Sequence, residues 1–367
     1  MKSIAVIIPA YRVEEHLIGV IQSIPASVDF VIVVNDNSPD NTLEKALSLD
    51  DPRLHVLTHT QNEGVGGAML TGYSYALKLG VDIAVKVDGD GQMDLQYLPA
   101  LLEPLEYGYA DYTKGNRFLH SSELKNMPFI RLIGNIALSF LTKLASGYWN
   151  IFDPTNGYTA ITCETMSQIR PSNIKKDYFY ETSLLCELRS LDAVIEDVPI
   201  PALYADEKSS MNVIKETFNF SANLIQRAFR RFFFQYFLFN FSAVSAYIVS
   251  GFILGIFGII WGAIFWHRSS ITGIPATTGT VLIAVLAIIL SAQLLIQAVA
   301  LDVESSPRRT YLKGYSASPR IPGSHPLLGY FDQHLKAGTV SITREGKFKG
   351  TGASASSGSF KAADALR

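Results

Sequence analysis

Two long apolar segments near the C-terminal end constrain the fold of this chain more than any other feature. Between Phe232 and Leu301 the only formally charged residue is Arg268, which separates an apolar segment at 241–266 from another at 279–301. As helices, these 26 and 23 residues would be about 39 and 34 Å long, enough to cross a hydrocarbon core of about 30 Å. A buried hairpin of a soluble protein is the alternative, but only 17% of all residues are charged, against about 25% in soluble domains. The sequence therefore predicts two transmembrane helices.

The basic residues around these segments predict their orientation. Cations flank the pair of segments, and the connection between them holds only Arg268. The flanking cations are Arg227, Arg230, Arg231, Arg308, Arg309 and Lys313. Because basic residues favour the cytoplasmic side of a membrane, we expect both termini to be cytoplasmic. No long apolar segment precedes residue 231, so we expect no signal peptide and a cytoplasmic location for the first 230 residues.

The remaining parts of the chain differ in composition and predict four regions. Residues 1–210 are expected to form a soluble domain, residues 211–240 an amphipathic juxtamembrane helix, and residues 241–303 the two spans. The amphipathic helix either lies in the headgroup plane or closes the soluble domain by packing on it. Residues 304–367 carry ten Lys/Arg and four Asp/Glu, so we expect a basic cytoplasmic tail that lies on anionic lipid or is simply solvated.

Composition also excludes some classes of protein. The formal net charge of −2 supplies no broad basic surface, so we expect no binding of nucleic acid. The two cysteines, Cys163 and Cys186, are too few and too far apart for a disulfide framework or a zinc cluster.

The first 210 residues alternate between short apolar runs rich in Val and Ile and stretches with helical periodicity. The runs are 4–9, 30–35, 54–58, 83–87 and 111–114. This rhythm predicts an α/β fold, a Rossmann-like, mostly parallel sheet with helices on both faces. Ligands of such sheets gather at the carboxyl ends of the strands, and several runs here end in polar residues.

The most informative of these strand ends is residues 88–92. Asp88 and Asp90 lie two residues apart after an apolar run, with Gly89 and Gly91 beside them and Gln92 following. Two such carboxylates can converge on one divalent cation, and oxygen ligands suit Mg2+ or Mn2+, which would bridge a diphosphate. Most isolated pairs of this kind are turns or solvated loops, so the position at a strand end is what favours a metal site.

Five motifs, taken together, resemble a known family. They are IPAY at 8–11, VVNDNSPD at 33–40, NEGVGGA at 62–68, KVDGDGQ at 86–92 and DPTNGY at 153–158. In this order they resemble the family 2 glycosyltransferases with a GT-A fold, of the polyprenyl-phosphate type that includes the dolichyl-phosphate mannose synthases. The two C-terminal spans also resemble those of bacterial polyprenyl-phosphate glycosyltransferases.

The resemblance implies a nucleotide-sugar donor and assigns residues to it. Pro9, Tyr11 and Asp36 would hold the base and ribose, although Asp36 could instead make an Asx-turn after its strand. Asn62 and Gly66 belong to a glycine-rich helix entry that would approach the nucleotide, or that forms a plain turn and helix cap. Asp88 would contact the nucleotide and help to hold the metal. Asp90 and Gln92 would be direct or water-mediated metal ligands.

The implied acceptor is a polyprenyl phosphate, either dolichyl or undecaprenyl. Its phosphate would be bound by Arg117, Arg131 and Lys208, together with Asn135 one helical turn after Arg131. Each of these cations could also be a solvated surface charge. Asp153 and Glu181 would orient the acceptor or a sugar hydroxyl, or act as a base. For Glu181 the alternative is a first-turn carboxylate that interacts with a helix dipole.

The implied reaction is an inverting, in-line displacement at the anomeric carbon. An acceptor phosphate is largely ionised near pH 7 and needs placement more than a base. Arg12-Val13 and Gly89-Asp90-Gly91 depart from the mannose-synthase pattern, which favours a UDP-sugar over GDP-mannose. The Gln-x-x-Arg-Trp element of polysaccharide synthases is missing around Gln226, which favours a single transfer.

Two other functions stay open at this point. One is transfer of a sugar to a hydroxyl of a lipid-linked oligosaccharide, which would need a true base. The other is a non-catalytic membrane component, such as a scaffold or part of a flippase. The sequence leaves open whether the protein forms a homo-oligomer in the bilayer.

Overall fold

The computed structural model describes residues 2–117, 129–201, 213–238, 241–308 and 326–346. Within these residues one sheet of eight strands has the order β7-β5-β6-β4-β1-β2-β3-β8. The strands are β1 (Ile4–Ala10), β2 (Phe30–Asn35), β3 (Leu54–His59), β4 (Ile83–Lys86), β5 (Tyr112–Asn116), β6 (Thr159–Thr162), β7 (Ile195–Pro199) and β8 (Val340–Arg344). The pairs β4-β1, β1-β2, β2-β3 and β5-β7 are parallel, whereas β6 and β8 pair antiparallel with their neighbours. The prediction of a mostly parallel sheet is confirmed.

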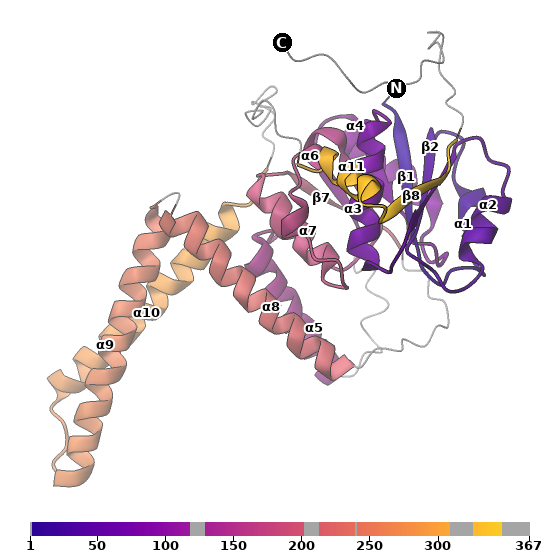
Figure 1. The fold of residues 1–367 in the computed structure, drawn as a ribbon. Helices are drawn as coiled ribbons and strands as arrows, with labels where there is room; N and C mark the ends of the chain where they lie inside the picture. The colour runs from indigo at the N-terminus through magenta and orange to yellow at the C-terminus, as the bar shows by residue number, and fades with distance from the viewer. Residues whose placement is uncertain (1, 118–128, 202–212, 239–240, 309–325, 347–367) are drawn as a thin grey trace.

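Helices cover both faces of this sheet (Figure 1). The helices of the soluble region are α1 (Leu17–Ser23), α2 (Thr42–Ser48), α3 (Gly64–Lys78), α4 (Leu98–Glu106), α5 (Phe129–Ser146), α6 (Cys163–Ser167), α7 (Tyr180–Ser190) and α11 (Leu328–Lys336). Along β1 the side chains alternate between two buried clusters, with Ala5 and Ile7 in one and Val6 and Ile8 in the other. Burial on both faces explains why the strands are continuous apolar runs.

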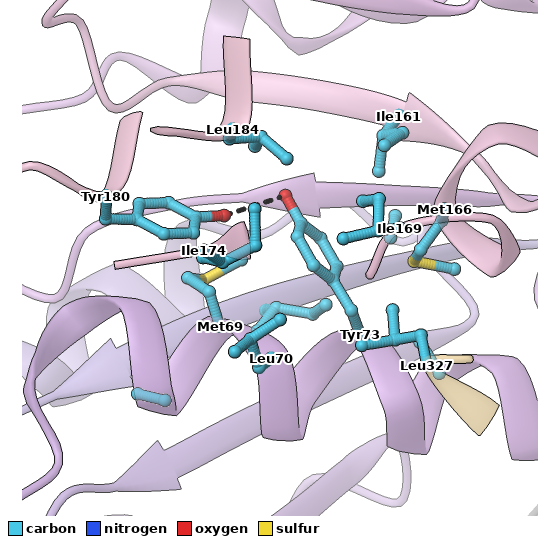
Figure 2. Close-up of a cluster of buried hydrophobic side chains, with 14 of the residues drawn as sticks. Met69, Leu70, Tyr73, Ile161, Met166, Ile169, Ile174, Tyr180, Leu184 and Leu327 are labelled. Atoms are coloured by element: carbon cyan, nitrogen blue, oxygen red, sulfur yellow. Dashed lines mark hydrogen bonds between the residues drawn. The ribbon is translucent and has the colours of Figure 1, made fainter. Parts of the chain in front are cut away.

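The larger cluster lies between the sheet and helices α3, α6, α7 and α11 (Figure 2). Tyr73 of α3 and Tyr180 of α7 are buried there, with their hydroxyl oxygens 3.4 Å apart. Leu327, which follows both apolar segments in the sequence, is also fully buried in this cluster. The C-terminal part of the chain therefore contributes to the core of the domain.

This finding corrects the predicted tail at 304–367. Within it, residues 326–346 form α11 and β8, and β8 pairs antiparallel with β3 at the edge of the sheet. The rest of the predicted tail after residue 308 lies outside the described residues.

The two apolar segments form a pair of long helices, α9 (Ala243–Thr272) and α10 (Thr278–Glu304). They lie side by side and project away from the sheet (Figure 1). Small residues allow close contact, because a Cβ at Gly258 would lie 2.8 Å from the Ile288 side chain, and Ser291 donates a hydrogen bond to the Gly251 carbonyl. In their most apolar windows only 11% and 17% of the residues are buried, unlike core helices of a soluble protein. Both helices are candidate membrane spans.

Helix α8 (Val213–Phe233) connects the domain to this hairpin through a short π-helix (Phe234–Leu238). Leu224 and Ala228 are buried against Ala145 of α5, while Ile225 and Phe229 are exposed. One face of α8 therefore packs on the domain, which is one of the two predicted arrangements. The other arrangement, contact of the exposed apolar face with the membrane, stays a prediction.

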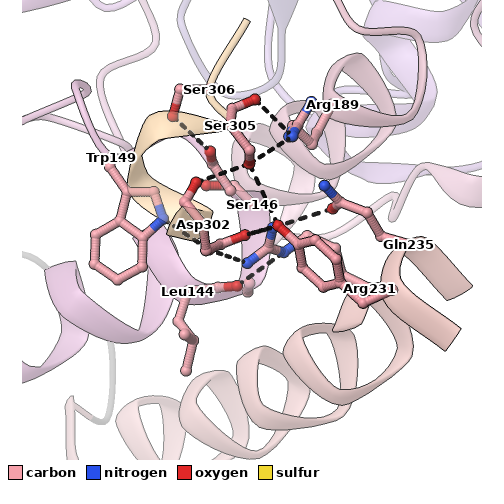
Figure 3. A network of polar contacts seen from close by, with 12 residues as sticks. Leu144, Ser146, Trp149, Arg189, Arg231, Gln235, Asp302, Ser305 and Ser306 are labelled. Atoms are coloured by element: carbon pink, nitrogen blue, oxygen red, sulfur yellow. Dashed lines mark hydrogen bonds and ion pairs between the residues drawn. The ribbon is translucent and has the colours of Figure 1, made fainter. Parts of the chain in front are cut away.

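A buried polar cluster joins the hairpin to the domain (Figure 3). Asp302, near the end of α10, is fully buried and accepts two hydrogen bonds of 2.8 Å from the Arg231 guanidinium of α8. It also accepts hydrogen bonds from Trp149 Nε1 at 2.8 Å and from the Tyr236 hydroxyl at 2.5 Å. Arg189 of α7 donates to the carbonyl oxygen of Ser305 at 3.0 Å. We call this cluster the joint, and it consists of Asp302, Arg231, Trp149, Tyr236, Arg189 and Ser305.

Replacement of Asp302 by Ala should lower the free energy of unfolding by about 3–5 kcal/mol, because it leaves the Arg231 charge buried without its partner. The change is measured by chemical unfolding of the purified protein in detergent. Asp332→Ala is the matched control, because Asp332 pairs with Lys78 at an exposed site and should cost at most about 1 kcal/mol. Equal losses in the two variants would contradict the importance of the buried pair.

Candidate active site

A cavity of about 420 Å³ opens beyond the carboxyl ends of β1, β2 and β4. Its walls come from these strand ends, the start of α3 and the loop that precedes α7. The predicted site residues that line it are Pro9, Tyr11, Asp36, Asn62, Asp88 and Asp90. The structure thus brings together side chains from three strand ends and one helix entry, as expected for a parallel sheet.

Asp36, after β2, is buried and holds the start of α3. Its two carboxylate oxygens accept hydrogen bonds from the backbone N–H groups of Glu63, at 2.8 Å, and Gly64, at 2.7 Å. His59 Nδ1 lies 2.7 Å from Asp36 Oδ1, and His59 Nε2 lies 2.9 Å from the Thr71 hydroxyl. Asp36 does not form the Asx-turn that was the alternative. The side chain of Asn35 forms the local turn instead, because its Oδ1 accepts a hydrogen bond from Ser38 N–H. The contact of Asp36 with a base stays a prediction.

The glycine-rich entry to α3 contacts the loop before α7. Gly66 N–H donates a hydrogen bond of 3.0 Å to the Lys176 carbonyl, and the backbone at 175–176 leaves no room for a Cβ on Gly64 or Gly66. Gly66 is therefore required for packing, and its contact with the nucleotide stays a prediction. The same loop places Asp177 and Tyr178 in the cavity wall. Neither residue is predictable from the sequence, because no local pattern indicates a contact between segments a hundred residues apart.

Lys86 occupies the centre of the charged part of the site. Its side chain is buried, with Nζ 2.5 Å from Asp88 Oδ1 and 3.5 Å from Glu181 Oε1. Burial alone would lower the pKa of Lys86, but the carboxylates of Asp88 and Glu181 outweigh burial and raise it. Glu181 does lie in the first turn of α7, and its carboxylate also faces Lys86. No role for Lys86 is evident from the sequence, because a lysine at the end of an apolar run is normally exposed.

The fit of a divalent metal rests on Asp88 and Asp90. Both line the cavity, and Asp90 Oδ1 also accepts a hydrogen bond from Gln92 N–H at 3.0 Å. The described part of the chain contains no group of three or more His, Cys, Asp or Glu that could hold a metal. Two carboxylates still suit Mg2+, which is commonly bound by one or two carboxylates together with substrate phosphates and water. Gln92 is not among the lining residues, and its predicted role is untested.

Arg117 and Asp153 form a bidentate ion pair beside β5. Arg117 Nε and Nη2 lie 2.7 and 3.0 Å from the two oxygens of Asp153, which is fully buried, whereas Arg117 is partly exposed. Both carboxylate oxygens of Asp153 are thus occupied by the guanidinium. The geometry favours a role for Asp153 in holding Arg117, and the contact of Arg117 with a phosphate remains a prediction.

The other predicted phosphate-binding side chains lie outside the described part of the structure. Arg131 and Asn135 fall on α5, where only the backbone is described at these positions, and Lys208 falls in the range 202–212. Their predicted roles are therefore untested.

Two further charged groups lie opposite each other on β5 and β7, where Lys114 is fully buried and Asp197 is half-buried. Burial lowers the pKa of Lys114 to about 8, in spite of nearby Glu181 and Asp153. Burial raises the pKa of Asp197 to about 6, although Phe152 N–H and Asn116 Nδ2 each donate a hydrogen bond to its Oδ2 at 2.9 Å. The carboxylate of Asp197 thus weakens the folded state when it is ionised.

The Asp197→Asn variant should therefore be more stable than the wild type by about 1–3 kcal/mol at pH 8. Asp197 has a folded pKa above its ordinary value of 3.8, so its favourable contribution is complete below about pH 4 and is lost as the pH rises through about 6. The advantage of the variant should accordingly vanish near pH 4 in unfolding experiments. Glu196→Gln, at an exposed position of the same strand, is the control, and a pH-independent difference would contradict the assignment.

Comparison with known proteins identifies the family. The profile of "Glycosyl transferase family 2" matches residues 5–170. A UDP-N-acetylglucosamine–dolichyl-phosphate N-acetylglucosaminyltransferase of Methanococcus voltae is 31% identical over 56% of this chain and 87% of its own length. An undecaprenyl-phosphate mannosyltransferase of Micrococcus luteus is 33% identical over 53% of this chain and 81% of its own length.

Solved structures of lower similarity were also found. The UDP complex of glucosyl-3-phosphoglycerate synthase from Mycobacterium tuberculosis has 21% identity and a TM-score of 0.47, and the match covers 62% of this chain and 80% of that chain. The sequence identity to relatives, the family profile and the cavity at the strand ends lead to one conclusion. The chain belongs to glycosyl transferase family 2 and is a glycosyltransferase with an α/β domain, built on a mostly parallel sheet, and two candidate membrane spans.

Proposed function

We propose that this glycosyltransferase moves one sugar from a nucleotide-sugar to a polyprenyl phosphate at the cytoplasmic face of a membrane. The observation that carries the proposal is the cavity, which gathers Asp36, Asp88 and Asp90 in a domain joined directly to two candidate spans. The names of two relatives with 31% and 33% identity support it, since one refers to dolichyl phosphate and the other to undecaprenyl phosphate.

The donor is proposed to be a UDP-sugar. Arg12 and Val13 depart from the mannose-synthase pattern, and the relative from Methanococcus voltae is named for a UDP-sugar donor. The base would lie between Pro9, Tyr11 and Asp36. At Asp36 a base N–H would share the carboxylate with the N–H groups of Glu63 and Gly64.

The diphosphate would lie beside Asp88 and Asp90. A bound Mg2+ or Mn2+ would neutralise charge that develops on the departing diphosphate. Lys86 holds Asp88 in place through the 2.5 Å contact and partly neutralises it. Gly157 allows this arrangement, because a Cβ there would lie 2.5 Å from Asp88 Oδ2 and 2.6 Å from Lys86 Nζ.

The acceptor phosphate would bind at the side of the site where Arg117 lies. Asp153 fixes the Arg117 guanidinium with two hydrogen bonds, so the guanidinium needs little reorganisation when a phosphate arrives. A phosphate that is already ionised attacks the anomeric carbon without a protein base. Transfer to an oligosaccharide hydroxyl is less well supported, because both candidate bases, Asp153 and Glu181, face cations.

The two spans would hold the domain at the membrane, where the polyprenyl chain remains. Arg227, Arg230 and Arg231 at the end of α8 favour the cytoplasmic side. The exposed Ile225 and Phe229 on the same helix would lie at the level of the headgroups. This placement would present the acceptor phosphate to the site without removal of its lipid chain from the bilayer.

The proposal is tested by purified protein with polyprenyl phosphate, Mg2+ or Mn2+ and a panel of UDP- and GDP-sugars, with sugar in the lipid fraction as the measurement. We expect metal-dependent transfer from one UDP-sugar. If no donor transfers sugar to polyprenyl phosphate, but sugar is transferred to a lipid-linked oligosaccharide, the acceptor group is a hydroxyl and not a phosphate.

Asp90→Ala should lower turnover in this assay by at least about 100-fold, because one of the two carboxylates available to the metal is lost. Asp94→Ala is the matched control. Asp94 caps a short helical turn through Gln96 N–H, so its loss should cost about 1 kcal/mol of stability and leave turnover nearly unchanged. Full activity of the Asp90 variant would contradict the metal site.

A further inference from the structure

The segment at 326–346 packs on two elements of the soluble domain after the chain has passed through both long helices. Strand β8 pairs antiparallel with β3, with Val340 opposite His59 in the register. Helix α11 packs against α3, where the Ser74 hydroxyl donates to the Leu327 carbonyl at 2.5 Å and accepts from Phe331 N–H at 3.1 Å. Figure 1 shows α11 and β8 in yellow beside α3. We call residues 326–346 the return segment.

The two elements that the return segment contacts are the ones that hold Asp36. His59, the last residue of β3, lies 2.7 Å from the Asp36 carboxylate, and its other ring nitrogen lies 2.9 Å from Thr71 of α3. The backbone N–H groups of Glu63, which precedes α3, and of Gly64, its first residue, donate to the same carboxylate. Any shift of α3 relative to β3 would therefore displace Asp36 in the cavity wall.

The return segment restrains the position of α3 relative to β3. Phe331 is buried against the Tyr75 ring of α3, with 5.3 Å between ring centroids. Immediately before β8, the Thr339 carbonyl accepts a hydrogen bond of 3.0 Å from Thr60 N–H, one residue after His59. One continuous piece of chain thus bonds to β3 and to α3 at the same time.

We propose that the return segment is a positioning element of the nucleotide subsite, acting on Asp36 through β3, His59 and α3. This inference rests on the proposed function only in taking a nucleoside diphosphate as the ligand of the cavity. Without the segment, α3 and β3 would spend part of the time in other relative positions. The apparent affinity for nucleotide falls in proportion to the fraction of molecules in the competent arrangement.

A purely structural role makes a different prediction. Strand β8 covers the edge of the sheet at β3, and covering an edge protects a protein from aggregation whether or not a ligand binds. A change in such a role would alter solubility and unfolding temperature and would leave nucleotide affinity of the folded protein unchanged. The two roles are therefore separated by ligand affinity.

The test uses full-length protein in detergent and measures binding of UDP and GDP with Mg2+ by calorimetry, followed by KM for donor and acceptor. Phe331→Ala should raise the dissociation constant for the preferred nucleotide by about tenfold, if the competent fraction falls to about one tenth, and leave the acceptor KM unchanged. Phe331→Leu should restore most of the affinity. Leu335→Ala is the control, because Leu335 lies on the same helix but is 40% exposed.

Ser74→Ala keeps the proposal testable if the Phe331 variant does not fold. It removes only the two hydrogen bonds of the Ser74 hydroxyl to residues 327 and 331. The dissociation constant should rise about threefold, if the fraction of molecules in the competent arrangement falls to about one third. Unchanged nucleotide affinity in the folded variants, or an equal rise in donor and acceptor KM, would overturn the proposal. Failure of the wild type to bind either nucleotide would instead overturn the proposed function.

Discussion

The buried ion pair between Asp302 and Arg231 is the contact on which the arrangement of this molecule depends. It lies where α10 ends and α8 meets the domain (Figure 3), and Asp302 also accepts hydrogen bonds from Trp149 and Tyr236. A buried carboxylate is tolerated only when its charge is neutralised and its oxygens are hydrogen-bonded. Because both conditions are met by groups from different parts of the chain, the hairpin and the domain hold one relative orientation.

The joint also leads directly to the charged residues of the site. Trp149, which donates to Asp302, lies four residues before Asp153, the partner of Arg117. Arg189, which donates to Ser305, lies at the end of α7, and Glu181 lies in the first turn of the same helix. The membrane hairpin is therefore connected by short, ordered pieces of chain to the side of the site assigned to the acceptor.

The sequence predicted the sheet and the spans well because their signals are local. Apolar runs such as 4–9 are long enough to identify a buried strand, and the residues at strand ends identified part of the cavity wall. The return segment was predicted as part of a tail, because a helix of nine residues and a strand of five are recognisable only from the surfaces of α3 and β3 that they cover. Lys86 was missed for a related reason. Its burial depends on pairing with Asp88 and Glu181, and Glu181 is distant from Lys86 in the sequence.

Several charged groups of the described site already have partners before any substrate binds. Lys86 faces Asp88 and Glu181, Arg117 faces Asp153, and backbone N–H groups with His59 face Asp36. An incoming nucleoside diphosphate adds negative charge that these pairs do not offset. A divalent cation that arrives with the diphosphate would neutralise that charge, and the carboxylates of Asp88 and Asp90 are placed to receive it. In this view the metal belongs as much to the substrate as to the protein.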